Sequence, residues 1–104
     1  MQLSTTKLEN VKEVKGVVKG TAIYSEKYMD SVKSAIEVKK GGFLDVFAAT
    51  TDKTINEAMD ELSSKAHDLE ANAVEGVRID IQNIVSNSND YITTVTVYGT
   101  AVVI

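Results

Sequence analysis

The chain has 104 residues, with 11 lysines and arginines against 15 aspartates and glutamates, no cysteine, and 43% apolar residues. The length fits a single domain over residues 1–104, which buries roughly 60 to 65% of the surface that its unfolded chain exposes, so a partner chain would add burial. The net charge of −4 excludes a general nucleic-acid binder, which needs clustered lysines and arginines, and the lack of cysteine excludes disulfides, thiolate nucleophiles and thiolate metal sites.

The first quarter of the chain has the composition of β-strands. Gln2–Thr5 predicts a short strand and Val11–Tyr24 a long one, because β-branched residues are frequent in strands. Gly16 and Gly20 lie four residues apart and therefore on one face of the long strand. Two glycines on one face predict the close approach of another backbone, such as a helix that crosses the sheet.

The spacing of apolar residues after this strand predicts a first helix over roughly residues 26 to 39. Ser25 is the candidate N-cap, and Lys39 and Lys40 place cations at the C-terminal end. Gly41 and Gly42 would end this helix.

A second helix is predicted by an apolar stripe that consists of Ile55, Met59, Leu62, Ala66, Leu69 and Ala73. Its start has two candidates. Thr54 and Glu57 form a capping box, whereas Leu44, Ala48 and Thr51 extend the stripe backwards. We predict the earlier start, close to Leu44 or Asp45.

Two alternating strands follow, Val74–Ser86 and Tyr91–Ile104, joined as a hairpin by residues 87–90. The order of elements is then β-β-α-α-β-β. We expect an α+β fold, a two-layer sandwich in which an antiparallel sheet of three main strands carries two helices on one face. The opposite sheet face is polar and rich in threonine, and it must meet water or another subunit. Its predicted members are Lys15, Val17, Lys19, Thr21, Arg78, Asp80, Gln82, Thr94, Thr96, Tyr98 and Thr100.

Four segments, in the same order, resemble the signature of the YbjQ-like family, whose members are labelled as heavy-metal-binding domains. They are Leu3-Ser4-Thr5-Thr6, Gly16-Val17-Val18-Lys19-Gly20, Leu69-Glu70-Ala71-Asn72-Ala73-Val74-Glu75-Gly76-Val77-Arg78-Ile79-Asp80 and Val97-Tyr98-Gly99-Thr100-Ala101-Val102. The resemblance implies a compact α+β subunit that assembles into a ring-shaped homopentamer, in which short extra strands join neighbours.

The chain departs from the family pattern at three places. Gly41–Ala48 lacks the arginine, serine and glutamate of the family's G-G-R-S-x-x-Y-E motif and keeps only an aromatic residue, Phe47. Asn72 stands where the family has aspartate, and Glu70 where it has glycine.

Candidates for catalysis or metal binding are weak. His67 is the sole histidine, and a metal site would have to combine it with Glu70 and Asp60, whereas zinc and copper sites converge three or four ligands. No nucleophile elbow, P-loop or Gly-x-Gly-x-x-Gly motif is present. We expect no bound metal, no cofactor and no enzymatic activity.

The remaining candidate site lies on the predicted open sheet face, where Lys19 and Arg78 accompany Tyr98. The simpler interpretation is a structural role in an oligomer interface. The functional interpretation is an anion-binding surface at a subunit junction, since arginine offers paired donors and tyrosine a stacking plane.

Three hypotheses for function therefore stand. The first, which we prefer, is a homo-oligomeric module that binds or sequesters a small ligand; the others are a metal-binding protein, as the family label suggests, and a ring scaffold for protein partners. No apolar run approaches the ~18 residues of a membrane-spanning helix. We therefore expect a soluble, cytoplasmic protein without membrane or nucleic-acid partners.

Overall fold

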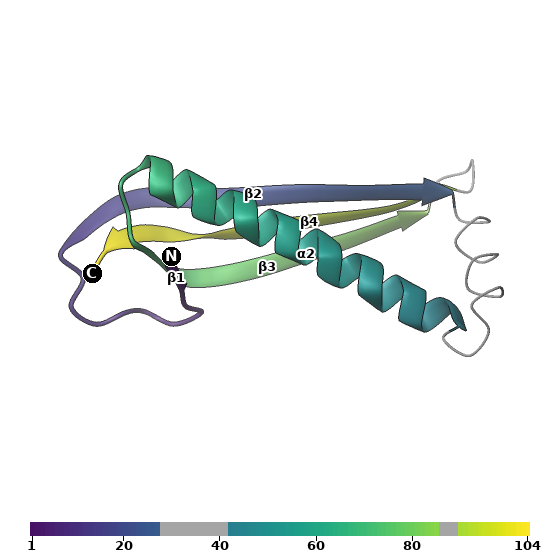
Figure 1. The fold of residues 1–104 in the computed structure, drawn as a ribbon, viewed down its shortest axis with the longest axis horizontal. Helices are drawn as coiled ribbons and strands as arrows, with labels where there is room; N and C mark the ends of the chain where they lie inside the picture. The colour runs from purple at the N-terminus through teal and green to yellow at the C-terminus, as the bar shows by residue number, and fades with distance from the viewer. Residues whose placement is uncertain (28–41, 86–89) are drawn as a thin grey trace.

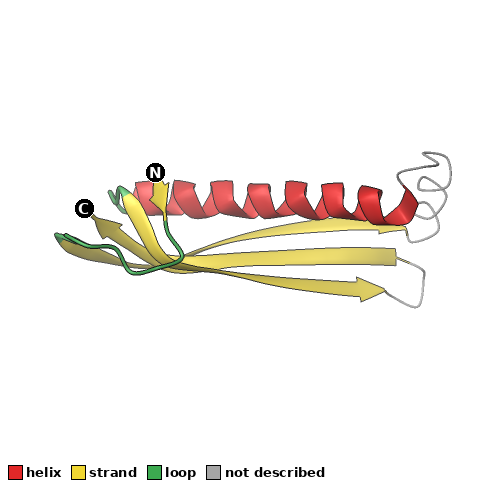
Figure 2. Ribbon diagram, turned by 90° about the horizontal axis from the view of Figure 1, so that it is seen from below, coloured by secondary structure: helices red, strands yellow, loops and turns green. Residues whose placement is uncertain are grey.

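The computed structural model describes residues 1–27, 42–85 and 90–104. Its elements are, in chain order, β1 (Gln2–Leu3), β2 (Glu13–Lys27), α2 (Gly42–Asp68), β3 (Ala73–Val85) and β4 (Asp90–Val103). The four strands form one sheet in the order β1-β3-β4-β2. Helix α2 crosses one face of this sheet obliquely, and the described part of the chain leaves the other face uncovered (Figures 1 and 2).

The predicted fold class is wrong in the make-up of both layers. The sheet is mixed, not antiparallel, because β1 adds a fourth strand that runs parallel to β3, with Gln2 opposite Ala73 and Leu3 opposite Val74. The described residues contain one helix instead of two. An alternating pattern identifies a strand but not its partner, and the partner decides the direction of pairing.

The predicted first helix fails at its N-cap. Ser25 belongs to β2, which pairs with β4 as far as Lys27, opposite Asp90. The backbone hydrogen bonds of this ladder outweigh the local capping preference of a serine. The rest of the predicted helix, residues 28–39, lies outside the described residues.

The predicted early start of the second helix is confirmed, since α2 begins at Gly42 and continues through the alternative start at Thr54. Its predicted end is wrong. The helix ends at Asp68, so Leu69 lies in the following turn and Ala73 opens β3.

A Schellman motif ends α2. The amide of Ala71 donates to the carbonyl of Ala66 at 3.0 Å, and the amide of Glu70 donates to that of His67 at 2.8 Å. Glu70 has a φ of 62°, the left-handed conformation that this motif requires and that glycine adopts most readily. The sequence therefore places a strained residue at the one position of the turn that favours glycine.

The core lies between α2 and the two strands β2 and β4. The helix presents small or aliphatic residues, Ala58, Leu62 and Ala66, all fully buried. They pack on a sheet surface formed by Val18, Ala22, Val95, Val97 and Ala101. The molecule is thin and long, with extents of 52 × 28 × 18 Å, so much of the sheet remains at the surface.

The backbone of the helix lies directly against Gly20, as the position of this glycine predicted. A Cβ at this residue would overlap the carbonyl oxygen of Ala58 and lie 2.6 Å from the amide nitrogen of Leu62. The same prediction is wrong for Gly16, which has nothing within 4 Å and a φ of +136°. A register shift between Val14 and Gly16 forms a bulge there, and glycine is needed for its backbone conformation.

Gly20→Ala should destabilise the fold by about 3 kcal/mol, because the added methyl meets helix backbone, which moves only if the whole helix shifts. Urea denaturation measures the loss. The neighbouring variant Thr21→Val, at an exposed position of the same strand, is the control and should change stability little. A Gly20→Ala protein as stable as the wild type would contradict the close approach.

Glu70→Gly should stabilise the protein by about 0.5 to 1 kcal/mol, because it removes the cost of a side chain at positive φ. Asp68→Gly, inside the last helical turn, should instead destabilise by about 1 kcal/mol. Thermal denaturation of both variants tests the pair, and two changes of the same sign would argue against the Schellman assignment.

Candidate functional site

The three predicted site residues lie in one row across the uncovered face of the sheet. Lys19 of β2 is opposite Tyr98 of β4, and Tyr98 is opposite Arg78 of β3. Residues that face each other across strands share a face, so the pairing brings the three side chains to neighbouring positions. Residues 59 positions apart in the sequence thus flank one tyrosine.

Tyr98 is well exposed, with 44% of its surface accessible. Lys19 is also exposed, and its ammonium forms no ion pair with any residue in the described ranges. Arg78 is held more firmly. Its Nη1 donates to the carbonyl oxygen of Thr5 at 2.8 Å and to that of Val77 at 3.0 Å.

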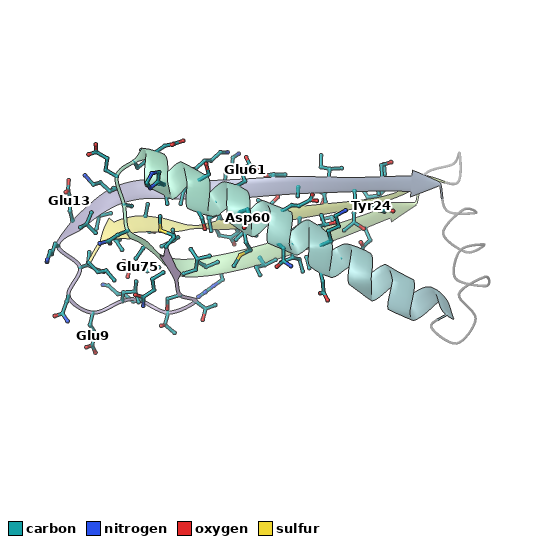
Figure 3. The ribbon with its side chains drawn as sticks, in the orientation of Figure 1. Glu9, Glu13, Tyr24, Asp60, Glu61 and Glu75 are labelled. Atoms are coloured by element: carbon teal, nitrogen blue, oxygen red, sulfur yellow. The ribbon has the colours of Figure 1, made fainter. Side chains whose placement is uncertain are left out.

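Arg78 and Glu75 together fix the segment that follows β1. The Glu75 carboxylate accepts a hydrogen bond from the amide of Leu8 at 2.7 Å, on the same stretch of chain that Arg78 holds at Thr5. Glu75 lies beside this N-terminal segment in Figure 3. Arg78 therefore has a structural contact within its own subunit, which the sequence did not indicate.

The row of Tyr98 has a polar row next to it. Asp80 of β3 lies opposite Thr96 of β4, and Thr96 lies opposite Thr21 of β2. On the other side of Tyr98, Thr100 pairs with Val17. Hydroxyl groups therefore precede and follow the tyrosine along β4, and a carboxylate stands one row away from the two cations.

The outer edge of β3 lacks a strand partner beyond its first residues, within the ranges that the structure describes. Backbone bonds from the N-terminal segment end at the amide of Val77, which donates to the carbonyl of Ser4 at 2.9 Å. Past this point Ile79 and Ile81, on the helix side of the sheet, are 48% and 40% exposed, and Ile84, on the opposite face, is 50% exposed. Helix α2 crosses the sheet obliquely (Figure 1), but it packs mainly on β2 and β4 and makes few contacts with this strand.

The opposite edge, β2, is protected. The amide of Thr21 donates to the Glu61 carboxylate of α2 at 3.2 Å, and Glu61 also pairs with Lys65 at 2.9 Å. Figure 3 shows Glu61 beside β2. With a bulge at Gly16 and lysines along the strand, this edge has the features that block strand addition.

The hydrogen bond from Lys65 and the one from the Thr21 amide lower the pKa of Glu61 below its ordinary value. The charged carboxylate is therefore favoured in the folded state, and it helps to hold helix and strand together at neutral pH.

A second row, on the helix side of the sheet, escaped the sequence analysis. Tyr24, Thr93 and Asn83 are opposite one another across β2, β4 and β3. Thr93 is fully buried, and its hydroxyl donates to Asn83 Oδ1 at 2.9 Å. The alternation of the strand could have indicated this burial, since Thr93 is two residues from the buried Val95 and therefore lies on the same face.

No helix in the described part of the chain is long and apolar enough to span a membrane.

The fold and the open face define a two-layer α+β module with a mixed sheet. A crystal structure of a protein with unknown function from Pediococcus pentosaceus shares this fold with a TM-score of 0.75, at 23% identity, over 100% of this chain and 97% of that one. The UPF0145 protein of Acidiphilium cryptum is 33% identical over 94 residues, which cover 90% of this chain and 82% of that protein. A second UPF0145 protein, from Acinetobacter baylyi, is 30% identical over 88 residues, or 85% and 78% of the two chains.

The model of the YbjQ family, described as "Putative heavy-metal-binding", matches residues 1–104. The chain belongs to this family, and the resemblance seen in its sequence motifs is confirmed.

The donor set does not fit the metal that the family description implies. Within residues 1–27, 42–85 and 90–104, no three histidine, aspartate or glutamate side chains come together as a possible metal site. His67 is exposed in the last turn of α2, where its carbonyl caps the turn.

Glu61→Gln should lower stability at pH 7 and make the protein less sensitive to acid. Because the folded pKa of Glu61 lies below the unfolded value of about 4.3, its contribution is full at neutral pH and disappears as the pH falls through the folded pKa. The difference in urea midpoint between wild type and variant should therefore be present at pH 7 and absent near pH 2. Glu57→Gln, on the exposed surface of the same helix, is the control. An equal difference at both pH values would contradict the role of the charge.

Proposed function

We propose that the protein is a homo-oligomeric module, a pentamer, that binds or sequesters a small anionic molecule at its subunit junctions and catalyses no reaction. The observation that carries this proposal is the row of Lys19, Tyr98 and Arg78 on the uncovered sheet face. Two cations flank one exposed aromatic residue there.

Two features of this row support anion binding, namely the distance between its two cations and the N–H groups that they can donate. Neighbouring strands lie about 4.8 Å apart, so the backbones of Lys19 and Arg78 are about 10 Å apart, with Tyr98 between them. Both cations form charge-assisted hydrogen bonds with carboxylate or phosphate oxygens. Arg78 is already anchored by the Thr5 carbonyl, which reduces the entropy that its side chain loses on binding a ligand.

Self-association is supported by the asymmetry of the two sheet edges. The β2 edge is occupied at its centre by Glu61, whereas the β3 edge presents Ile79 and Ile81 beside backbone groups without a described partner. An exposed apolar edge strand favours pairing with another chain. Arg78 lies on this same strand, so a ligand bound to it would be close to a subunit junction.

Native mass spectrometry tests the assembly. We expect a mass of about 56 kDa, five copies of an 11.3 kDa chain. Ile81→Lys should shift the protein towards monomers, because it places a charge on the open edge. Leu69→Lys is the matched control, since Leu69 is 41% exposed and Ile81 40%, but Leu69 is not on the β3 edge. A wild-type monomer at micromolar concentration would refute the proposal.

Calorimetric titration with inorganic phosphate tests the anion site. Lys19→Ala should weaken binding by about 1.5 to 3 kcal/mol through loss of charge-assisted hydrogen bonds. Lys53→Ala, on the exposed face of α2, removes an equal charge and is the control. Equal affinities for the two variants would place the anion elsewhere.

A further inference from the structure

We infer that the molecule bound at the row of Lys19, Tyr98 and Arg78 is a nucleoside monophosphate, whose base stacks on Tyr98 and whose phosphate is held by the cations. This inference rests on the proposed anion-binding function and names the class of ligand. It is supported by two adjacent rows of residues on the uncovered face, the row of Lys19, Tyr98 and Arg78 and the row that contains Asp80 and Thr96. The first row is cationic and the second contains a carboxylate, and together they offer three kinds of contact.

The first contact is aromatic. Tyr98 is 44% exposed, and its neighbours along the same face of β4 are Thr96 and Thr100, whose short side chains leave the ring accessible. A simple inorganic anion would make no use of such a ring. Stacking of a nucleobase on an aromatic side chain strengthens binding by about tenfold or more.

The second contact is with the phosphate. Lys19 and Arg78 are each one strand away from Tyr98, or about 4.8 Å between backbones. A phosphate attached to a ring stacked on Tyr98 lies within reach of these cations. Nη1 of Arg78 is engaged by the carbonyl of Thr5, on the side of β3 away from Tyr98, so the phosphate would use the other N–H groups of this guanidinium, whereas the exposed Lys19 side chain is free to follow the ligand.

The third contact is with hydrogen-bond donors of the ligand. Asp80 and Thr96 form the next row, beside the cations. An ionised carboxylate only accepts hydrogen bonds, so Asp80 suits an exocyclic amino group or a ribose hydroxyl and repels a second phosphate. The face therefore fits a molecule with one anionic end and a donor-bearing ring, not a chain of phosphates.

The same charges argue against a polynucleotide. Binding along a nucleic acid backbone requires a series of cations, and here Asp80 interrupts the series immediately after the row of Lys19 and Arg78. The chain as a whole carries a net charge of −4, which also repels an extended polyanion. A single nucleotide makes one phosphate contact and avoids this repulsion.

The test is calorimetric titration of the intact wild-type protein with adenosine monophosphate, adenosine and inorganic phosphate at one ionic strength. The monophosphate should bind at least tenfold more tightly than either of the other two. Tyr98→Leu should reduce the affinity for the monophosphate by about tenfold and leave the affinity for phosphate unchanged. Tyr98→Phe, which keeps the aromatic ring, should leave both affinities at the wild-type value. Native mass and thermal denaturation verify that each variant remains assembled and folded.

Asp80→Asn provides a further arm, because it should weaken the binding of adenosine monophosphate and not that of phosphate. Equal affinities for phosphate and adenosine monophosphate would overturn the nucleotide inference and leave the proposed anion site standing. If neither phosphate nor adenosine monophosphate binds, the nucleotide inference and the proposed anion site are both overturned. Tighter binding of single-stranded oligoadenylate than of the monophosphate would also overturn the choice of a mononucleotide.

Discussion

The close approach of α2 to β2 at Gly20 is the constraint on which the rest of the structure depends. The helix backbone occupies the space where a side chain would stand, so the residues around the contact are small, and Ala58 and Ala66 are fully buried. A helix seated this low packs closely on β2 and β4 and makes few contacts with β3. The exposure of Ile79 and Ile81, on the helix side of β3, therefore follows from the position of a single glycine two strands away.

The two edges of the sheet differ because the elements next to them differ. The helix lies near β2 and contributes Glu61, which accepts the amide of Thr21 and occupies that edge. At β3 the N-terminal segment pairs only as far as Val77, where Glu75 and Arg78 hold it against the sheet. Arg78 thus marks the boundary between the covered and the free part of β3, and it also belongs to the candidate ligand row.

Two departures from the family pattern have identifiable structural consequences. Asn72 forms a reciprocal pair with Ile104, donating from Nδ2 to its carbonyl at 3.0 Å and accepting from its amide at 2.8 Å. An ionised aspartate accepts hydrogen bonds but does not donate them, so it would form only one of these two hydrogen bonds, whereas the asparagine amide forms both. Glu70, by contrast, carries a side chain at a φ of 62°, a conformation that strains every residue except glycine.

The sequence by itself determined the long strands, the early start of α2, the alternation that separates Thr96 and Tyr98 from Val95 and Val97, and the family. The elements and their alternation depend on local periodicity, which is a property of neighbouring residues, and the family was recognised from short motifs in the sequence. Only the tertiary structure decided the parallel pairing of β1, the continuation of β2 through Ser25, and the anchoring of Arg78 by Thr5. Each of these depends on which distant segment supplies the hydrogen-bond partner. The local sequence of one segment does not specify that partner, because the pairing is fixed only when the strands are aligned in register.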